Sequence, residues 1–282
     1  MFATRENGPI NSISSMTLFF NTRMYDVTPN AKRAWINVVK WISRQSDIGM
    51  ELIEHEPPKL LSDLWLRDDL GAVMMCGLPL ARRTVVPQIL AQCIPTAPRY
   101  RGQAVYCTDI VVAAESPFQT LADTFGHRAG YTLKDSQSGY YAFRHHLLTR
   151  YAAVQQPYQH ITGNLMNARG VIHAIARGDI DVGPLDGYVH DLIRHTDAAF
   201  AGQVRIIEST QPTPMPAIVT TAPLDEVCLR RLRQAFVSVA HAPELVEERN
   251  TLLIAGFVEP SSEIFAPLLQ RALEVDVARV WP

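Results

Sequence analysis

Two proline-rich segments constrain the fold of this chain more than any other feature of its sequence. The first is "CIPTAPRYRG" (93–102), and the second is "VRIIESTQPTPMPAIVTT" (204–221), where three prolines alternate with other residues. Proline fixes its own backbone angle and restricts the residue before it, so both segments are expected to be extended. They predict two crossings between separate structural units, near residues 95–103 and 208–217.

Strand and helix patterns alternate on both sides of the first crossing. An apolar strand pattern within 16–26 is followed by an amphipathic helix pattern over 32–44, and the apolar run at 70–80 predicts a strand buried on both faces. After the crossing, "AVYCTDIVVAA" (104–114) predicts a strand and "PFQTLADTFG" (117–126) a short helix. This alternation predicts an α/β fold with parallel sheets.

The helix patterns that follow the second crossing have no sheet of their own nearby, so the chain is expected to return to the first unit. We predict a two-lobed α/β protein with an interlobe cleft. Residues 1–102 and 214–282 form a discontinuous lobe 1, and residues 103–213 form an inserted lobe 2. A length of 282 residues suits two lobes of about 100–150 residues each.

Composition excludes several classes of protein. The net charge of −2 is inconsistent with a broad nucleic-acid surface, so no nucleic-acid partner is expected. No window approaches the ~20 apolar residues of a membrane span, which predicts no membrane insertion. The cysteines lie in or beside apolar runs without C-x-x-C spacing, and buried thiols are expected at Cys76, Cys93, Cys107 and Cys228.

The stretch "KDSQSGYYAFRHHLL" (134–148) combines small polar residues with the apolar face of a helix. Ser136 or Asp135 could simply cap that helix. Alternatively, the amides at the helix start and the hydroxyls of Ser136 and Ser138 could hold an oxyanion, which Gly139 would allow to approach closely. Both interpretations remain open from the residues alone.

Several segments together resemble a known family. They include "MYD", "CGLPL", the run "SPFQTLADTFGHRAGYTLKDSQSGY" and "GDIDVGPLD", in that order. The chain resembles the phosphate/phosphite/phosphonate-type substrate-binding proteins of ABC transporters over roughly residues 16–260. The resemblance implies a type II periplasmic-binding-protein fold, a small anionic ligand held in the cleft, and an ABC transporter permease as partner. It implies no cofactor and no metal.

The resemblance and the positions of strand ends together predict the ligand-binding residues. Asp186 follows the strand pattern "IDVGPL", at the sheet edge where α/β proteins place ligands, although it could equally be a turn or capping residue. Tyr25 ends the first strand pattern, and Gly77 lies in the "CGLPL" turn. The predicted set is Tyr25, Gly77, Ser136, Gln137, Ser138, Gly139, Tyr140 and Asp186.

One departure from the family bears on the ligand. Family members often carry a Ser-His pair before the helix that precedes "GDIDVGPLD", and the register places that pair on Asn167 and Ala168. The histidine is absent, and Asn164 is a candidate to replace it. A ligand other than a phosphonate is therefore an open alternative.

An enzyme on the same scaffold is the second hypothesis, with Cys76, Asp186 or a histidine in the cleft as candidate groups. No G-x-S-x-G, Walker or G-x-G-x-x-G motif supports it. The histidine pairs at 145–146 and 190–195 are badly spaced for a shared metal. The location stays undecided: the family implies the periplasm, whereas the start of the sequence shows no secretory leader, which predicts a cytoplasmic location if the sequence is complete.

Overall fold

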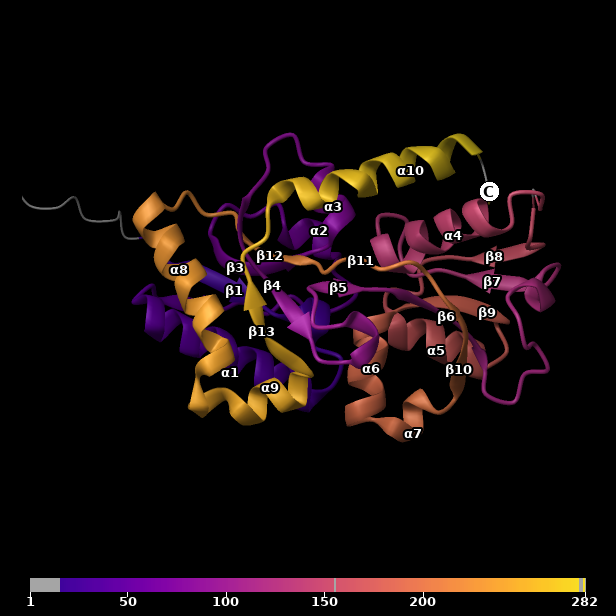
Figure 1. Ribbon diagram of the computed structural model, residues 1–282, viewed down its shortest axis with the longest axis horizontal. Coiled ribbons are helices and arrows are strands. Elements are labelled where there is room, and N and C mark those ends of the chain that lie inside the picture. The colour runs from indigo at the N-terminus through magenta and orange to yellow at the C-terminus, as the bar shows by residue number, and fades with distance from the viewer. Residues whose placement is uncertain (1–15, 155, 279–280, 282) are drawn as a thin grey trace, which may run out of the picture.

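The computed structural model of the chain describes residues 16–154, 156–278 and 281. It contains two large mixed sheets joined by a small one (Figure 1). We call the part built on the first sheet lobe 1 and the part built on the second sheet lobe 2. The predicted α/β class with two lobes is confirmed.

The sheet of lobe 1 has the strand order β13-β4-β12-β3-β1-β2. Its strands are β1 (Leu18–Asn21), β2 (Met50–Leu52), β3 (Leu70–Met75), β4 (Gln88–Pro95), β12 (Ala217–Thr220) and β13 (Ile254–Val258). Helices of the same lobe are α1 (Pro29–Ser46), α2 (Leu61–Leu64), α3 (Gly77–Ala81), α8 (Glu226–Ser238) and α9 (Val246–Leu252).

The sheet of lobe 2 has the order β10-β6-β9-β7-β8. Its strands are β6 (Thr108–Ala113), β7 (Arg128–Gly130), β8 (His160–Thr162), β9 (Val182–Asp186) and β10 (Val204–Ser209). The helices are α4 (Ala142–Arg150), α5 (Ala168–Ala176), α6 (Gly187–Thr196) and α7 (Ala198–Ala201).

The two crossings form a hinge of paired strands. β5 (Val105–Tyr106) and β11 (Thr213–Pro214) pair antiparallel, with Thr213 opposite Tyr106. In Figure 1 both strands lie between the two large sheets. The second proline-rich segment is extended at β11 and β12, as predicted, whereas the first is extended only to Pro95 and then turns through a 3-10 helix at Pro98–Tyr100, so the prediction for it is wrong.

The prediction of parallel sheets is only partly correct. β1 pairs parallel with β2 and β3, and β7 pairs parallel with β8 and β9. β12, in contrast, is antiparallel to both β3 and β4, and β6 is antiparallel to both β9 and β10. The hinge explains the difference, because the chain leaves lobe 1 along β4 and returns beside it along β12.

The predicted helix at 117–126 is wrong. The structure has only a 3-10 turn at Ala122–Thr124. The carboxylate of Asp123 accepts hydrogen bonds from the amides of Gln119 and Thr120, both at 2.8 Å. Such local side-chain bonds offer the backbone an alternative to a helix, and this explains the error.

The C-terminal helix α10 (Ala266–Ala278) connects the lobes a third time. It begins beside α3, where Leu268 and Phe265 pack closely on Gly77, and it runs along the top of Figure 1 to α4 of lobe 2. There Asp276 pairs with the Arg144 guanidinium at 2.8 Å. The buried Trp281 ring lies 5.2 Å from the Phe143 ring, measured between centroids. Both lobes therefore hold this part of the chain.

Candidate functional site

The candidate site is a cavity of about 190 Å³ between the lobes. This volume is below the roughly 300–1,000 Å³ of pockets that take drug-sized ligands, so the cavity suits a smaller molecule. Among the residues predicted from sequence, those that line it are Tyr25, Ser136, Ser138, Gly139 and Asp186.

The start of the α4 segment supplies the polar part of the wall. Ser136 precedes a π-helical turn (Gln137–Tyr141) that continues into α4, and the Ser136 Oγ accepts a hydrogen bond from the Gly139 amide at 2.9 Å. The amides of Gln137 and Ser138 belong to the first turn and have no intrahelical acceptor. Because a hydroxyl that accepts one bond keeps its own proton, Ser136 can still donate. The cap and the anion cradle are therefore compatible interpretations of one structure.

Gly139 is required by packing within lobe 2. A Cβ atom at this position would lie 1.8 Å from Thr132 Oγ1 and 2.8 Å from Thr132 Cβ. The backbone of the two residues is also joined, since the Thr132 amide donates to the Gly139 carbonyl at 3.2 Å. The glycine thus fixes the helix start against Thr132, which also lines the cavity.

Asp186 is the last residue of β9 and the N-cap of α6. Its Oδ1 accepts from the Val189 amide at 3.0 Å, so the capping role weighed from the sequence is present, and the same residue lines the cavity. Burial raises the pKa of its carboxyl to about 7, and the nearby charges of Asp109 and Asp191 act in the same direction. At neutral pH this carboxyl can therefore carry a proton or lose it to a cationic partner.

The raised pKa makes a prediction for stability against pH. Because the folded protein holds this proton up to about pH 7 and the unfolded chain releases it near 3.8, the free energy of unfolding contributed by Asp186 falls as pH rises between these values. Asp186→Asn keeps a capping oxygen and removes the titration. We expect urea unfolding at pH 8 to show the variant gaining stability relative to the wild type, compared with pH 4.

Asp181 provides the matched control for that experiment, because it flanks the other end of the same strand. Hydrogen bonds from Arg128 lower the pKa of its carboxyl, so its contribution is present above the unfolded pKa and lost in acid. Asp181→Asn should lose stability at pH 8 relative to pH 4, opposite in sign to Asp186→Asn. Equal slopes for the two variants would contradict the assignment of Asp186.

A charged network that the sequence analysis did not identify lies behind Asp186. Asp109 in β6 is completely buried, and its carboxylate accepts from Arg99 Nη1 at 2.7 Å, His190 Nδ1 at 3.0 Å and Ser209 Oγ at 2.8 Å. Burial alone would raise the pKa of Asp109, but the hydrogen bonds from His190 and Arg99 hold it below its usual value. A carboxylate inside the apolar strand pattern "YCTDIVV" was the available signal.

Arg99 connects this network to the turn at Asp186 and Gly187, which borders the cavity. Its Nη2 donates to the Gly187 carbonyl at 2.7 Å and to Asp191 Oδ2 at 2.8 Å. Gly187 directly follows Asp186, and a Cβ there would lie 2.6 Å from the Cys107 carbonyl oxygen. Because Arg99 belongs to the first hinge crossing, the hinge backbone is fixed to the turn that presents Asp186.

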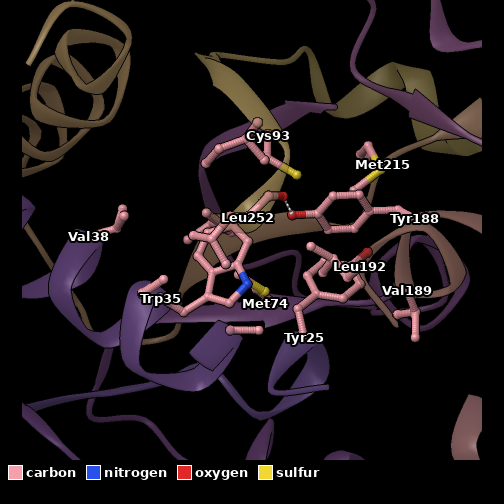
Figure 2. Packing of buried hydrophobic residues seen from close by; sticks show 14 of the residues in the cluster. Tyr25, Trp35, Val38, Met74, Cys93, Tyr188, Val189, Leu192, Met215 and Leu252 are labelled. Carbon is pink, nitrogen blue, oxygen red and sulfur yellow. Dashed lines mark hydrogen bonds between the residues drawn. The ribbon is translucent and has the colours of Figure 1, made fainter. Parts of the chain in front are cut away.

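Tyr25 closes the cavity from lobe 1. It ends the 3-10 turn Arg23–Tyr25, its ring stacks on Trp35 and its edge meets Tyr188 of lobe 2 at 4.9 Å between centroids (Figure 2). Among the described residues its buried hydroxyl has no hydrogen-bond partner, and burial raises its pKa well above the usual value. The Tyr188 hydroxyl donates to the Leu252 carbonyl at 2.6 Å, which joins α6 of lobe 2 to α9 of lobe 1.

Three predicted residues lie outside the lining of the cavity. Gly77 faces Leu268 and Phe265 under α10. Gln137 is 2% exposed and borders a separate hollow between α4 and the second hinge crossing. The Tyr140 ring packs 4.7 Å from the Tyr131 ring in an aromatic cluster that includes Trp281.

The two positions of the missing Ser-His pair do line the cavity. Asn167 caps α5, because its Oδ1 accepts from the Gly170 amide at 3.0 Å, and Ala168 is the first residue of that helix. Asn164 lies outside the lining and has a positive φ of 59°. At the position of the family's histidine, this chain therefore presents a methyl group.

Metal and thiol chemistry have no geometric support in the part of the chain that the structure describes. No group of three His, Cys, Asp or Glu side chains is placed to hold a metal ion among those residues. The four cysteines are free thiols; Cys93, Cys107 and Cys228 are buried as predicted, whereas Cys76, which lines the cavity, is half-buried, and desolvation of its thiol raises its pKa to about 12. Over the same residues, no helix is long and apolar enough to span a membrane.

Comparison with known proteins gives a family match and several similar structures. The model of a family described as "ABC transporter, phosphonate, periplasmic substrate-binding protein" matches residues 78–264. A search of curated proteins found no match.

Three solved structures are similar over most of the chain. A binding protein component of an ABC phosphonate transporter from Pseudomonas aeruginosa has a TM-score of 0.77, 15% identity, and coverage of 93% of this chain and 87% of that chain. PhnD1 from Prochlorococcus marinus in complex with methylphosphonate has a TM-score of 0.76 and 13% identity, with coverage of 93% of this chain and 98% of that chain. XAC2383 from Xanthomonas citri bound to ATP has a TM-score of 0.65 and 18% identity, with coverage of 94% of this chain and 98% of that chain. These similarities confirm the type II periplasmic-binding-protein fold.

Proposed function

The chain belongs to the phosphonate substrate-binding protein family of ABC transporters, and from this premise we propose that it binds a small phosphonate- or phosphate-like oxyanion between its lobes. Proteins of this family bind a substrate for uptake, so the chain is a substrate-binding protein rather than an enzyme. Its ligand is a small molecule, and the anionic character of that ligand is the part we propose.

The start of the α4 segment is the observation that carries the proposal. Ser136, Ser138 and Gly139 line the interlobe cavity at a helix start, which offers partial positive charge to an anion. Tyr25 would add its buried hydroxyl from lobe 1. Asp186 would pair with a cationic group of the ligand or, when protonated, donate to an oxyanion oxygen.

Among similar structures, PhnD1 binds methylphosphonate and XAC2383 binds ATP. The cavity of about 190 Å³ favours the smaller kind of ligand for this chain. We also propose that an ABC transporter permease receives the ligand, and that the predicted lobes, 1–102 with 214–282 and 103–213, move against each other, except that α10 contacts both lobes and residues 1–15, 279–280 and 282 lie outside the described residues. The positions of the two sheets and the β5–β11 hinge support that division.

Isothermal titration calorimetry with phosphate, phosphite, methylphosphonate and 2-aminoethylphosphonate tests the proposal. We expect saturable binding of at least one of them with one site per chain. Silence across all four compounds, with a protein shown to be folded by its thermal transition, would contradict an oxyanion site.

A further inference from the structure

The two lobes contribute chemically different walls to the cavity. Lobe 2 contributes polar residues, chiefly those at the start of the α4 segment, Thr132 and Asp186, together with the apolar residues Leu133, Met166, Ala168, Val189 and Ile193. Lobe 1 contributes mainly apolar side chains, which are Met24, Val27, Leu61, Trp65 and Pro79. A ligand between the lobes therefore meets the polar helix start on the lobe 2 side only, and a mainly apolar lining on the lobe 1 side.

Two polar side chains of the lobe 1 lining, Arg23 and Trp65, are bonded inside the protein, whereas the Tyr25 hydroxyl and the Asp26 Oδ1 have no hydrogen-bond partner among the described residues. Arg23 Nη1 donates to the His55 carbonyl at 2.9 Å and to the Lys59 carbonyl at 2.5 Å, which fixes the loop that leads into α2. The Trp65 indole has a single donor, Nε1, and it donates to the Met74 carbonyl at 3.0 Å. Trp65 therefore presents only apolar surface to a ligand.

The lining also contains the charged side chains of Arg169 and Asp26. Arg169, the second arginine in the lining, donates to the Val27 carbonyl at 2.8 Å and pairs with Asp197 at 2.7 Å. Asp26 of lobe 1 lines the cavity, and burial raises the pKa of its carboxyl to about 6. Arg169 of lobe 2 is neutralised by Asp197, whereas Arg23 of lobe 1 is held by two backbone carbonyls and keeps its charge.

Resting on the proposed function, we infer that the preferred ligand is an oxyanion with an apolar substituent larger than a methyl group. The oxyanion lies against Ser136 and Ser138 of lobe 2, and the substituent lies against Leu61, Trp65 and Met24 of lobe 1. Met24 of lobe 1 and Met166 of lobe 2 both line the cavity and give it an adaptable surface for such a group. Ala168, where relatives often carry histidine, extends the apolar lining.

A series of alkylphosphonates tests this inference by calorimetry. Methyl-, ethyl-, propyl- and phenylphosphonate share one head group and differ in apolar size. Because each buried methylene contributes about 0.8 kcal/mol, we expect affinity to rise up to about fourfold per methylene, and propylphosphonate to bind roughly tenfold more tightly than methylphosphonate. Methylphosphonate binding as tightly as or more tightly than the longer compounds would overturn the inference and leave the proposed function standing. Silence of the whole series would overturn both.

A pair of variants locates the effect on lobe 1. Leu61→Asn should reduce the preference for propylphosphonate over methylphosphonate to about one. Leu66→Asn is the matched control, because Leu66 lies five residues away, is 77% exposed and is outside the lining; it should retain the preference. Thermal transitions of both variants show whether each is folded. If Leu61→Asn is folded and keeps the full preference, the apolar wall does not hold the substituent.

Discussion

Replacing Ser136 and Ser138 together with alanine is expected to weaken binding of the tightest compound in the phosphonate series at least about 100-fold. A hydrogen bond to a charged group contributes about 1.5–3 kcal/mol, and both serines line the cavity at one helix start. The single variants should each show a smaller loss. Calorimetry on all three variants measures the effect.

Loss of the helix cap is the competing explanation for that result. Ser136→Ala also removes the acceptor for the Gly139 amide, which costs about 1 kcal/mol of stability. Ser261→Ala is a suitable control, because Ser261 accepts from the Glu263 amide at another helix start, outside the cavity. Ser261→Ala should bind ligand normally. If the double variant also binds normally, the stretch 136–139 is a cap and nothing more.

Arg99→Ala is expected to lower the free energy of unfolding by about 3 kcal/mol, which is the largest stability effect we predict. Removing Arg99 leaves the fully buried Asp109 carboxylate with its bonds from His190, Ser209 and the Cys107 thiol but without its cationic partner. Breaking a buried ion pair by removing one partner typically costs about 3–5 kcal/mol. Urea denaturation at pH 7 measures the loss.

Arg128→Ala is the matched control, because Arg128 also pairs with an aspartate of lobe 2. The Nη2 of Arg128 lies 2.8 Å from Asp181 Oδ1, but this pair is partly exposed, and such pairs contribute at most about 1 kcal/mol. A loss for Arg99→Ala no larger than for Arg128→Ala would show that the hinge network is not a major source of stability.

The order of elements was predictable from the sequence because each strand and helix carries its own periodic pattern. The proline-rich segments also predicted where the two crossings lie, since proline acts through local backbone geometry. Strand direction was less accessible. β12 pairs with β4, and β6 pairs with β10, and in each pair one strand lies before one crossing and the other lies after a crossing. These pairings depend on contacts between residues far apart in the sequence.

The site was predictable where a residue's role comes from its local segment. Ser136 at a helix start and Asp186 at a strand end belong to this kind, and both line the cavity. Leu61 and Trp65 could not be assigned from sequence, because they reach the cavity only through the loop before α2, which Arg23 binds at the His55 carbonyl. Whether the predicted residues bind a ligand remains a prediction.

A crystal structure of the protein grown with propylphosphonate tests the central claim most directly. We predict density for the phosphonate oxygens within hydrogen-bonding distance of Ser136, Ser138 and the first-turn amides, with the alkyl group against Leu61 and Trp65. Density on an outer surface of either lobe, or an oxyanion bound away from residues 136–139, would contradict the account.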